Sequence, residues 1–162
     1  MNVLSVVKSM DFRQLWSLFW LSVKHLRFVI PTIRATQKTI AISDELYGDK
    51  HHQNGPENGF RHAIWNILIV QYCVERGRSL DASIAWAKLI TDWHEDFSPN
   101  EPLARAMDLH NNQLGRDLIE EFPAENEDFL VAHLLKMVPL SRKRTLVQQL
   151  ENDKGFLVHI ED

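Results

Sequence analysis

The stretch ENGFRHAIWNILIVQYCVER, residues 57–76, decides the fold class, because it predicts a long helix with polar groups on its apolar face. Asn58, His62 and Asn66 recur every four residues, and apolar side chains continue the same face. Gly77 follows, as glycine commonly does after the last turn of a helix. Burying a polar side chain without a partner costs about 2 kcal/mol or more. The stripe therefore predicts a hydrogen-bonded site inside the protein, either functional or structural.

Helical patterns continue on both sides of this stretch, with no repeat, low-complexity segment or dividing linker. Further helices are expected over residues 11–27, from Pro31 to about 48, 79–97, 102–122, 126–137 and 141–151, and a short strand at 156–160 without an evident partner. We predict an all-α, single-domain bundle of about six to seven helices over residues 1–162. Its parts would be basic, aromatic N-terminal helices (1–50), a motif-bearing core (55–122) and C-terminal helices (123–162).

Composition is that of a folded globular protein, with 44% hydrophobic and 25% charged residues in 162. Its one cysteine, Cys73, has no partner for an internal disulfide, which suits a reducing compartment. No secretory signal is visible at the start, and the apolar run at residues 15–21 is much too short to span a membrane. We therefore expect a cytoplasmic protein, with effector-type export left open.

Charge is divided unevenly along the chain. Residues 1–43 hold six basic side chains and one acidic one, whereas residues 44–162 hold 12 basic and 21 acidic ones. The basic, aromatic segment is expected to pack on the acidic body. The alternative is peripheral contact with an anionic membrane or a protein through residues 12–30. The acidity of residues 44–162 argues against nucleic-acid binding.

The helix expected over residues 102–122 repeats the polar pattern more strongly. Asp108, Asn111 and Gly115 lie within its apolar sector, with Asn112 beside them. Gly115 in mid-helix costs roughly 1 kcal/mol relative to alanine, so another backbone or a substrate is expected to approach closely there. A purely structural network between two helices would produce the same pattern.

The helix over residues 79–97 contributes weaker candidates. His94 borders its apolar stripe, whereas Glu95 points well away from that stripe on an ideal helix. The His-Glu pair is not the zinc-binding H-E-x-x-H motif, because Ser98 stands where the second histidine would be. Outside these helices, His51 and His52 are expected in a solvated loop, and residues 142–144 on a solvated helix face.

The segments NGFRHAIWN (58–66) and MDLHNNQLGR (107–116) resemble an uncharacterised bacterial helical family. That family is marked by R-H-A-x-W-N, a later His-Glu and M-D-x-x-N-N-x-x-G-R. Its members occur as free-standing proteins and as C-terminal modules of larger, sometimes toxin-like, proteins. The similarity covers about residues 55–120, and Asn58 stands where the family pattern carries an acid. With no settled activity, the family implies only that these residues matter.

The first functional hypothesis is a hydrolase acting on an ester or phosphoester. His62, oriented by Asp108, would be the general base toward water. The oxyanion donors would be amide side chains: Asn66, Asn111 and Asn112. Substrate contacts are assigned to Arg61, Arg116, Gly115 and Asn58.

A divalent metal ion would serve the same reaction. His62, His94 and Asp108 are suitable ligands, with Glu95 or His110 completing the set. Two alternatives stay open: an interaction or immunity-type module whose polar cluster only fixes helix packing, and a membrane- or envelope-directed, toxin-like hydrolase. A small-molecule, lipid or envelope substrate fits the enzymatic hypotheses. An open site would favour an enzyme and a sealed one a module.

Overall fold

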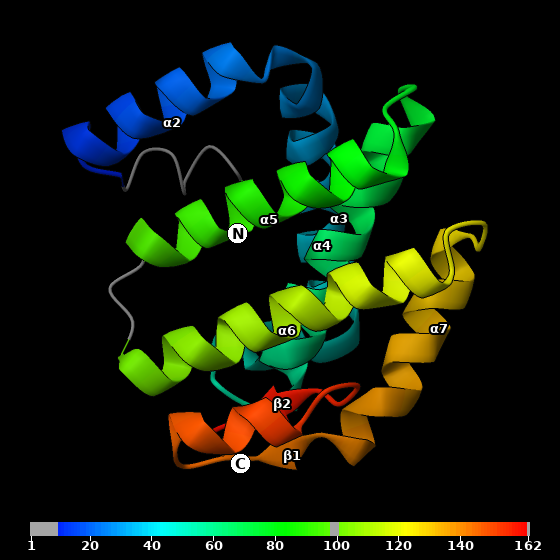
Figure 1. Cartoon of the computed structure of the whole chain (residues 1–162). Coiled ribbons are helices and arrows are strands. Elements are labelled where there is room, and N and C mark those ends of the chain that lie inside the picture. The colour runs from blue at the N-terminus through cyan, green and yellow to red at the C-terminus, as the bar shows by residue number, and fades with distance from the viewer. Residues whose placement is uncertain (1–9, 98–100, 162) are drawn as a thin grey trace.

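The computed structural model describes residues 10–97 and 101–161, and it confirms an all-α bundle (Figure 1). The longer helices are α2 (Phe12–Lys24), α3 (Leu26–Tyr47), α4 (Pro56–Glu75), α5 (Leu80–Phe97), α6 (Pro102–Glu121) and α7 (Glu127–Met137). The shorter elements are the 3-10 turns η1 (Gly48–His52), η2 (Val138–Leu140) and η3 (Val147–Asn152) and the strands β1 (Arg142–Lys143) and β2 (Val158–His159).

Helix α4 is the centre of the bundle. It packs against α3, α5, α6 and α7, and α5 and α6 lie side by side in front of it in Figure 1. Twelve of its residues are buried, which explains why its sequence is apolar over much of its circumference. The polar side chains Asn58, His62 and Asn66 therefore enter the core, as the spacing predicted.

Helices α4 and α6 approach one another closely at Gly115. A Cβ atom built there would lie 2.2 Å from the carbonyl oxygen of Ala63. The glycine in the middle of α6 is therefore required by the backbone of a neighbouring helix, the first of the two reasons expected for it. This contact fixes the spacing between the two helices that carry the polar stripes.

The N-terminal helices differ in one respect from expectation. Asp11 caps α2 as predicted, accepting from the Gln14 backbone N–H at 2.8 Å. However, α3 begins at Leu26, five residues before Pro31, which lies inside the helix. Proline removes one backbone donor, and packing of α3 against α4 offsets that loss.

Helix α2 packs on the body of the protein through one side only. None of its residues is buried, and Phe12 and Trp16 are 79% and 54% exposed. Its inner side contributes Leu18 and Leu21 to the core. No helix among residues 10–97 and 101–161 is long and apolar enough to cross a membrane.

The C-terminal segment does not form the helix predicted over 141–151. Instead β1 pairs in parallel with β2, which supplies the partner that sequence reasoning did not find for the final strand. Asp153 is fully buried and binds Arg142 and Arg144, so these arginines are not a solvated helix face. A buried carboxylate that gathers two guanidinium groups holds the segment in its extended form.

Candidate functional site

Three ionisable side chains from three helices meet in the core. His62 of α4, Glu95 of α5 and Asp108 of α6 each offer one ligand atom, and these atoms lie within 4.8 Å of one another. His62 Nε2 is 3.2 Å from Asp108 Oδ1, and His62 Nδ1 is 3.6 Å from Glu95 Oε1. All three side chains are almost fully buried. We call them the central cluster.

Glu95, and not His94, is the residue that α5 contributes. One face of α5 presents its apolar stripe to α2 and α3, and a second face is also buried, formed by Ser83, Ala87, Thr91 and Glu95. Helical spacing predicts that Glu95 points away from the apolar stripe, a prediction that assumes only one face of this helix is buried. The signal that would have found it is the spacing of small and polar residues every four positions from Ser83.

His94 lies beside the cluster on the other side of α5. Its ring packs edge-on against Trp65, with centroids 5.3 Å apart. Burial is the main cause that lowers the pKa of His94 to about 4, with Arg61 contributing further. At neutral pH it is therefore a neutral imidazole.

His62 is also neutral at physiological pH. Burial lowers its pKa well below the usual value, and the nearby charge of Arg61 acts in the same direction. The Arg61 guanidinium donates to His62 Nε2, with Nη2 at 2.9 Å, so this nitrogen is an acceptor. The other ring nitrogen, Nδ1, then carries the proton and faces Asn112 Oδ1 at 3.3 Å.

The two carboxyl groups of the cluster are held in an unfavourable environment. Burial raises the pKa of Glu95, and the proximity of Asp108 raises it further. Burial likewise raises the pKa of Asp108, while Arg61 opposes the shift. No donor among residues 10–97 and 101–161 reaches Glu95 Oε2 within hydrogen-bond distance. The site therefore lacks one positive charge or one proton when both groups are ionised.

An amide network behind the cluster fixes its geometry. Asn112 accepts from Asn66 at 2.7 Å and donates to Glu95 Oε1 at 3.3 Å. Asn66 in turn accepts from the buried guanidinium of Arg116 at 2.8 Å. These polar atoms are engaged with one another. Asn112 positions Glu95 and His62 directly, and it is held in turn by Asn66 and, through Asn66, by Arg116. The oxyanion and substrate contacts predicted for Asn66, Asn112 and Arg116 stay predictions.

Other predicted site residues hold the fold together. Asn111 is bonded in both directions to the Val158 backbone, at 2.9 and 3.0 Å, and His110 binds the Phe156 carbonyl group. The Asn58 side chain donates to the Gln53 carbonyl group at 2.7 Å. With Gly115 in a helix contact, none of these residues belongs to the central cluster.

A cavity of about 300 Å³ reaches the cluster at His62 from the side of α2 and α3, and Glu95 and Asp108 are not on its lining. Its polar lining from α4 and α5 consists of Arg61, His62 and His94. The remaining wall is largely apolar, with contributions from α2 (Leu18), α3 (Val29, Ile33, Ile40), α4 (Trp65) and α5 (Trp86, Ile90, Trp93). A concave, mostly apolar space with a few polar groups is the usual form of a small-molecule site.

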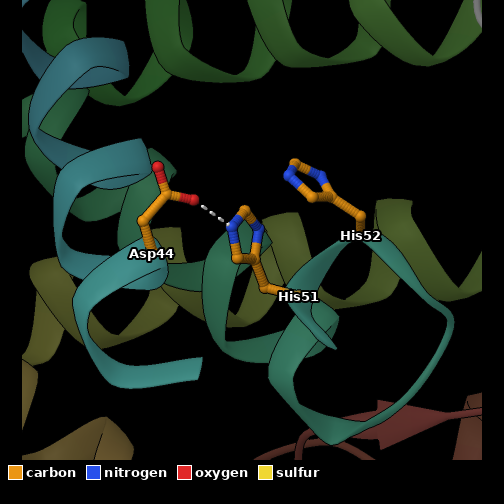
Figure 2. A group of neighbouring side chains, drawn as sticks. All are labelled: Asp44, His51 and His52. Carbon is orange, nitrogen blue, oxygen red and sulfur yellow. Dashed lines mark hydrogen bonds and ion pairs between the residues drawn. The ribbon is translucent and has the colours of Figure 1, made fainter. Parts of the chain in front are cut away.

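A second group of possible ligands lies at the end of α3 and in η1 (Figure 2). His51 is fully buried, contrary to the expected solvation, and its Nε2 lies 2.7 Å from Asp44 Oδ1. His52 is exposed and its Nδ1 is 3.4 Å from Arg61 Nη1. Since Arg61 contacts both His52 and His62, this group borders the central cluster.

Comparison with known proteins gives a family and no function. No curated protein and no solved structure matches the chain. Residues 19–142 match the family described as Domain of unknown function (DUF6973). The matched range extends beyond the two quoted motifs on both sides. Since the match spans most of the 162 residues, the chain belongs to this family of unknown function.

Proposed function

We propose that the protein is a hydrolase of an ester or phosphoester, with a divalent cation held by the central cluster. The observation that carries the proposal is the convergence of one imidazole and two carboxylates beside a cavity. Nitrogen and carboxylate oxygen together are the ligands that zinc and manganese accept in proteins. To bind the cation, His62 would offer Nε2 and exchange the hydrogen bond from Arg61 for the metal. Three protein ligands leave a position for water or substrate.

The balance of charge supports a cation. Glu95 and Asp108 carry two negative charges when ionised, and the positive charge of Arg61 acts on both. Arg105 has the smallest effect on the pKa of Glu95, and it is already paired with Asp96 at the surface. His62 adds no positive charge, because it is neutral. A buried carboxylate without compensation is costly, and Glu95 Oε2 accepts no hydrogen bond from a donor within the described residues. A divalent cation would compensate the negative charge of the carboxylates and would bind Glu95 Oε2.

The residues around the cluster have separate tasks in this proposal. A divalent cation, when bound, supplies Lewis-acid stabilisation of the charge that develops on the substrate oxygen. Arg61 lies on the cavity wall and would bind an anionic or carbonyl oxygen of the substrate. Asn112 holds Glu95 and His62 in place through its side-chain amide.

The test is metal binding and hydrolysis by the purified chain and by two matched variants. Titrations with Zn²⁺, Mn²⁺ and Mg²⁺ are followed by assays on nitrophenyl esters and phosphoesters of differing chain length. We expect one cation per chain and cation-dependent turnover, both lost in Glu95→Gln. The control Asp96→Asn changes the neighbouring, exposed carboxylate and should retain both. Wild-type metal binding and turnover in Glu95→Gln would refute the proposed site.

A non-enzymatic interaction module is the second candidate. Near-complete burial of the cluster and the exposed aromatic face of α2 favour it. In that case the wild-type chain binds no cation and hydrolyses none of the test compounds. Glu95→Gln would then be at least as stable as the parent, because a buried charge is removed without loss of a ligand.

A further inference from the structure

The wall of the cavity carries polar atoms that are largely occupied by one another. The indole N–H of Trp86 donates to the Thr32 hydroxyl at 2.8 Å, and that of Trp65 donates to Thr36 at 2.9 Å. Both threonine hydroxyls donate in turn to backbone carbonyl groups of α3, each at 2.8 Å. These four side chains therefore present an apolar surface to the cavity.

Polar groups with capacity to bind a ligand remain at a few positions. Among the described lining residues, Arg61 is the charged one, whereas His62 and His94 are neutral. Both ring nitrogens of His62 are already bonded, to Arg61 and Asn112. The Thr39 hydroxyl is also on the lining, is buried and has no hydrogen-bond partner within residues 10–97 and 101–161. A buried hydroxyl in that condition is expected to bond a ligand or a water.

From this distribution we propose that the cavity binds the single alkyl or acyl chain of an anionic amphiphile, with its head group at Arg61. The inference rests on the proposed function and names the substrate class of that site. A guanidinium beside an apolar space matches an anion attached to a hydrocarbon chain.

The size of the cavity limits the chain. At about 300 Å³ it lies at the lower end of the range for small-molecule pockets. It holds roughly ten groups the size of a water molecule, at about 30 Å³ each. One chain of medium length fits this space, whereas two chains do not.

Binding is measured with alkylphosphonates, which have an anionic head and no ester bond to hydrolyse. Trp65, Trp86 and Trp93 line the cavity, so their fluorescence reports occupancy directly. We expect Kd to fall about fourfold for each added methylene, from butyl to octyl, as hydrocarbon leaves water. The series continues to dodecyl, and the decrease in Kd should stop near a chain of about ten groups, when the cavity is full.

Two variants test the two ends of the proposed ligand. Val29→Phe fills the chain-binding space and should weaken octylphosphonate binding at least tenfold, whereas Val74→Phe, an exposed position on α4 outside this cavity, should not. Arg61→Gln should weaken octylphosphonate binding but leave octanol binding unchanged. Circular dichroism confirms that each variant is folded.

The results separate this inference from the proposed function. Chain-length-dependent binding without hydrolysis would support the cavity and overturn the hydrolase. Hydrolysis with a Kd independent of chain length, or undiminished binding in Val29→Phe, would overturn the inference alone. Equal losses of phosphonate and octanol binding in Arg61→Gln would overturn the assignment of the head group.

Discussion

Replacing Gly115 with alanine tests whether the contact between α4 and α6 sets the geometry of the central cluster. In an exposed helix the change would stabilise by about 1 kcal/mol, because alanine has the higher helix propensity. Here the new Cβ would lie 2.2 Å from the Ala63 carbonyl oxygen, about 1.2 Å closer than ordinary contact at 3.4 Å. The neighbour is backbone and has no rotamer that would relieve the overlap.

The two helices must therefore move apart. Overpacking of this kind costs typically about 1–3 kcal/mol, and a gap of 0.5–1 Å forfeits roughly a quarter to a half of each dispersion contact along the interface. The overlap is with backbone, which places the cost at the upper end of this range, about 3 kcal/mol. After subtracting about 1 kcal/mol for helix propensity, we expect Gly115→Ala to destabilise the protein by about 2 kcal/mol. For a chain of this length that lowers Tm by roughly 4–8 °C.

The assay combines urea unfolding with cation titration. The distance of 3.2 Å between His62 Nε2 and Asp108 Oδ1 spans the same two helices, so Gly115→Ala should also weaken cation binding. The control is Glu120→Ala on the exposed face of α6, which should change stability by less than about 0.5 kcal/mol. An alanine variant that matches or exceeds the parent in stability would refute the close approach.

Two further predictions concern the C-terminal segment. Asn111→Ala should lower the free energy of unfolding in urea by about 2–4 kcal/mol, because it leaves the buried N–H and carbonyl groups of Val158 without their partner. An unchanged unfolding midpoint with loss of turnover would instead support the predicted oxyanion role of Asn111. Hydrogen bonds from Arg144 and Arg142 lower the pKa of Asp153, so its stabilisation is present above the unfolded pKa near 4 and is lost as pH falls through the folded pKa. Asp153→Asn should therefore be less stable than the parent by about 2 kcal/mol at pH 7, with a difference that shrinks only below about pH 4, and a constant difference down to pH 2 would contradict this.

Local patterns predicted much of the helical framework. Helices α4, α6 and α7 occur close to their expected bounds, because apolar periodicity, proline and glycine act within a few residues of the chain. The helix predicted over residues 141–151 was wrong because the C-terminal segment depends on contacts between residues distant in sequence. Its strand pairing joins residues 142–143 to 158–159, and its fixed form depends on the buried Asp153, a contact that no local pattern records.

Helical spacing alone predicts that α4 and α6 each bury polar side chains, because it places His62 and Asp108 on apolar faces wherever the helices pack. Which of those side chains meet depends on how the helices pack against one another. Helix α5 is covered on two faces, so Glu95 enters the cluster while His94 turns to the cavity. Asn111, equally inward on α6, meets the C-terminal strand instead. A helix fixes the direction of its side chains, but the partner in each direction is set by neighbours distant in sequence.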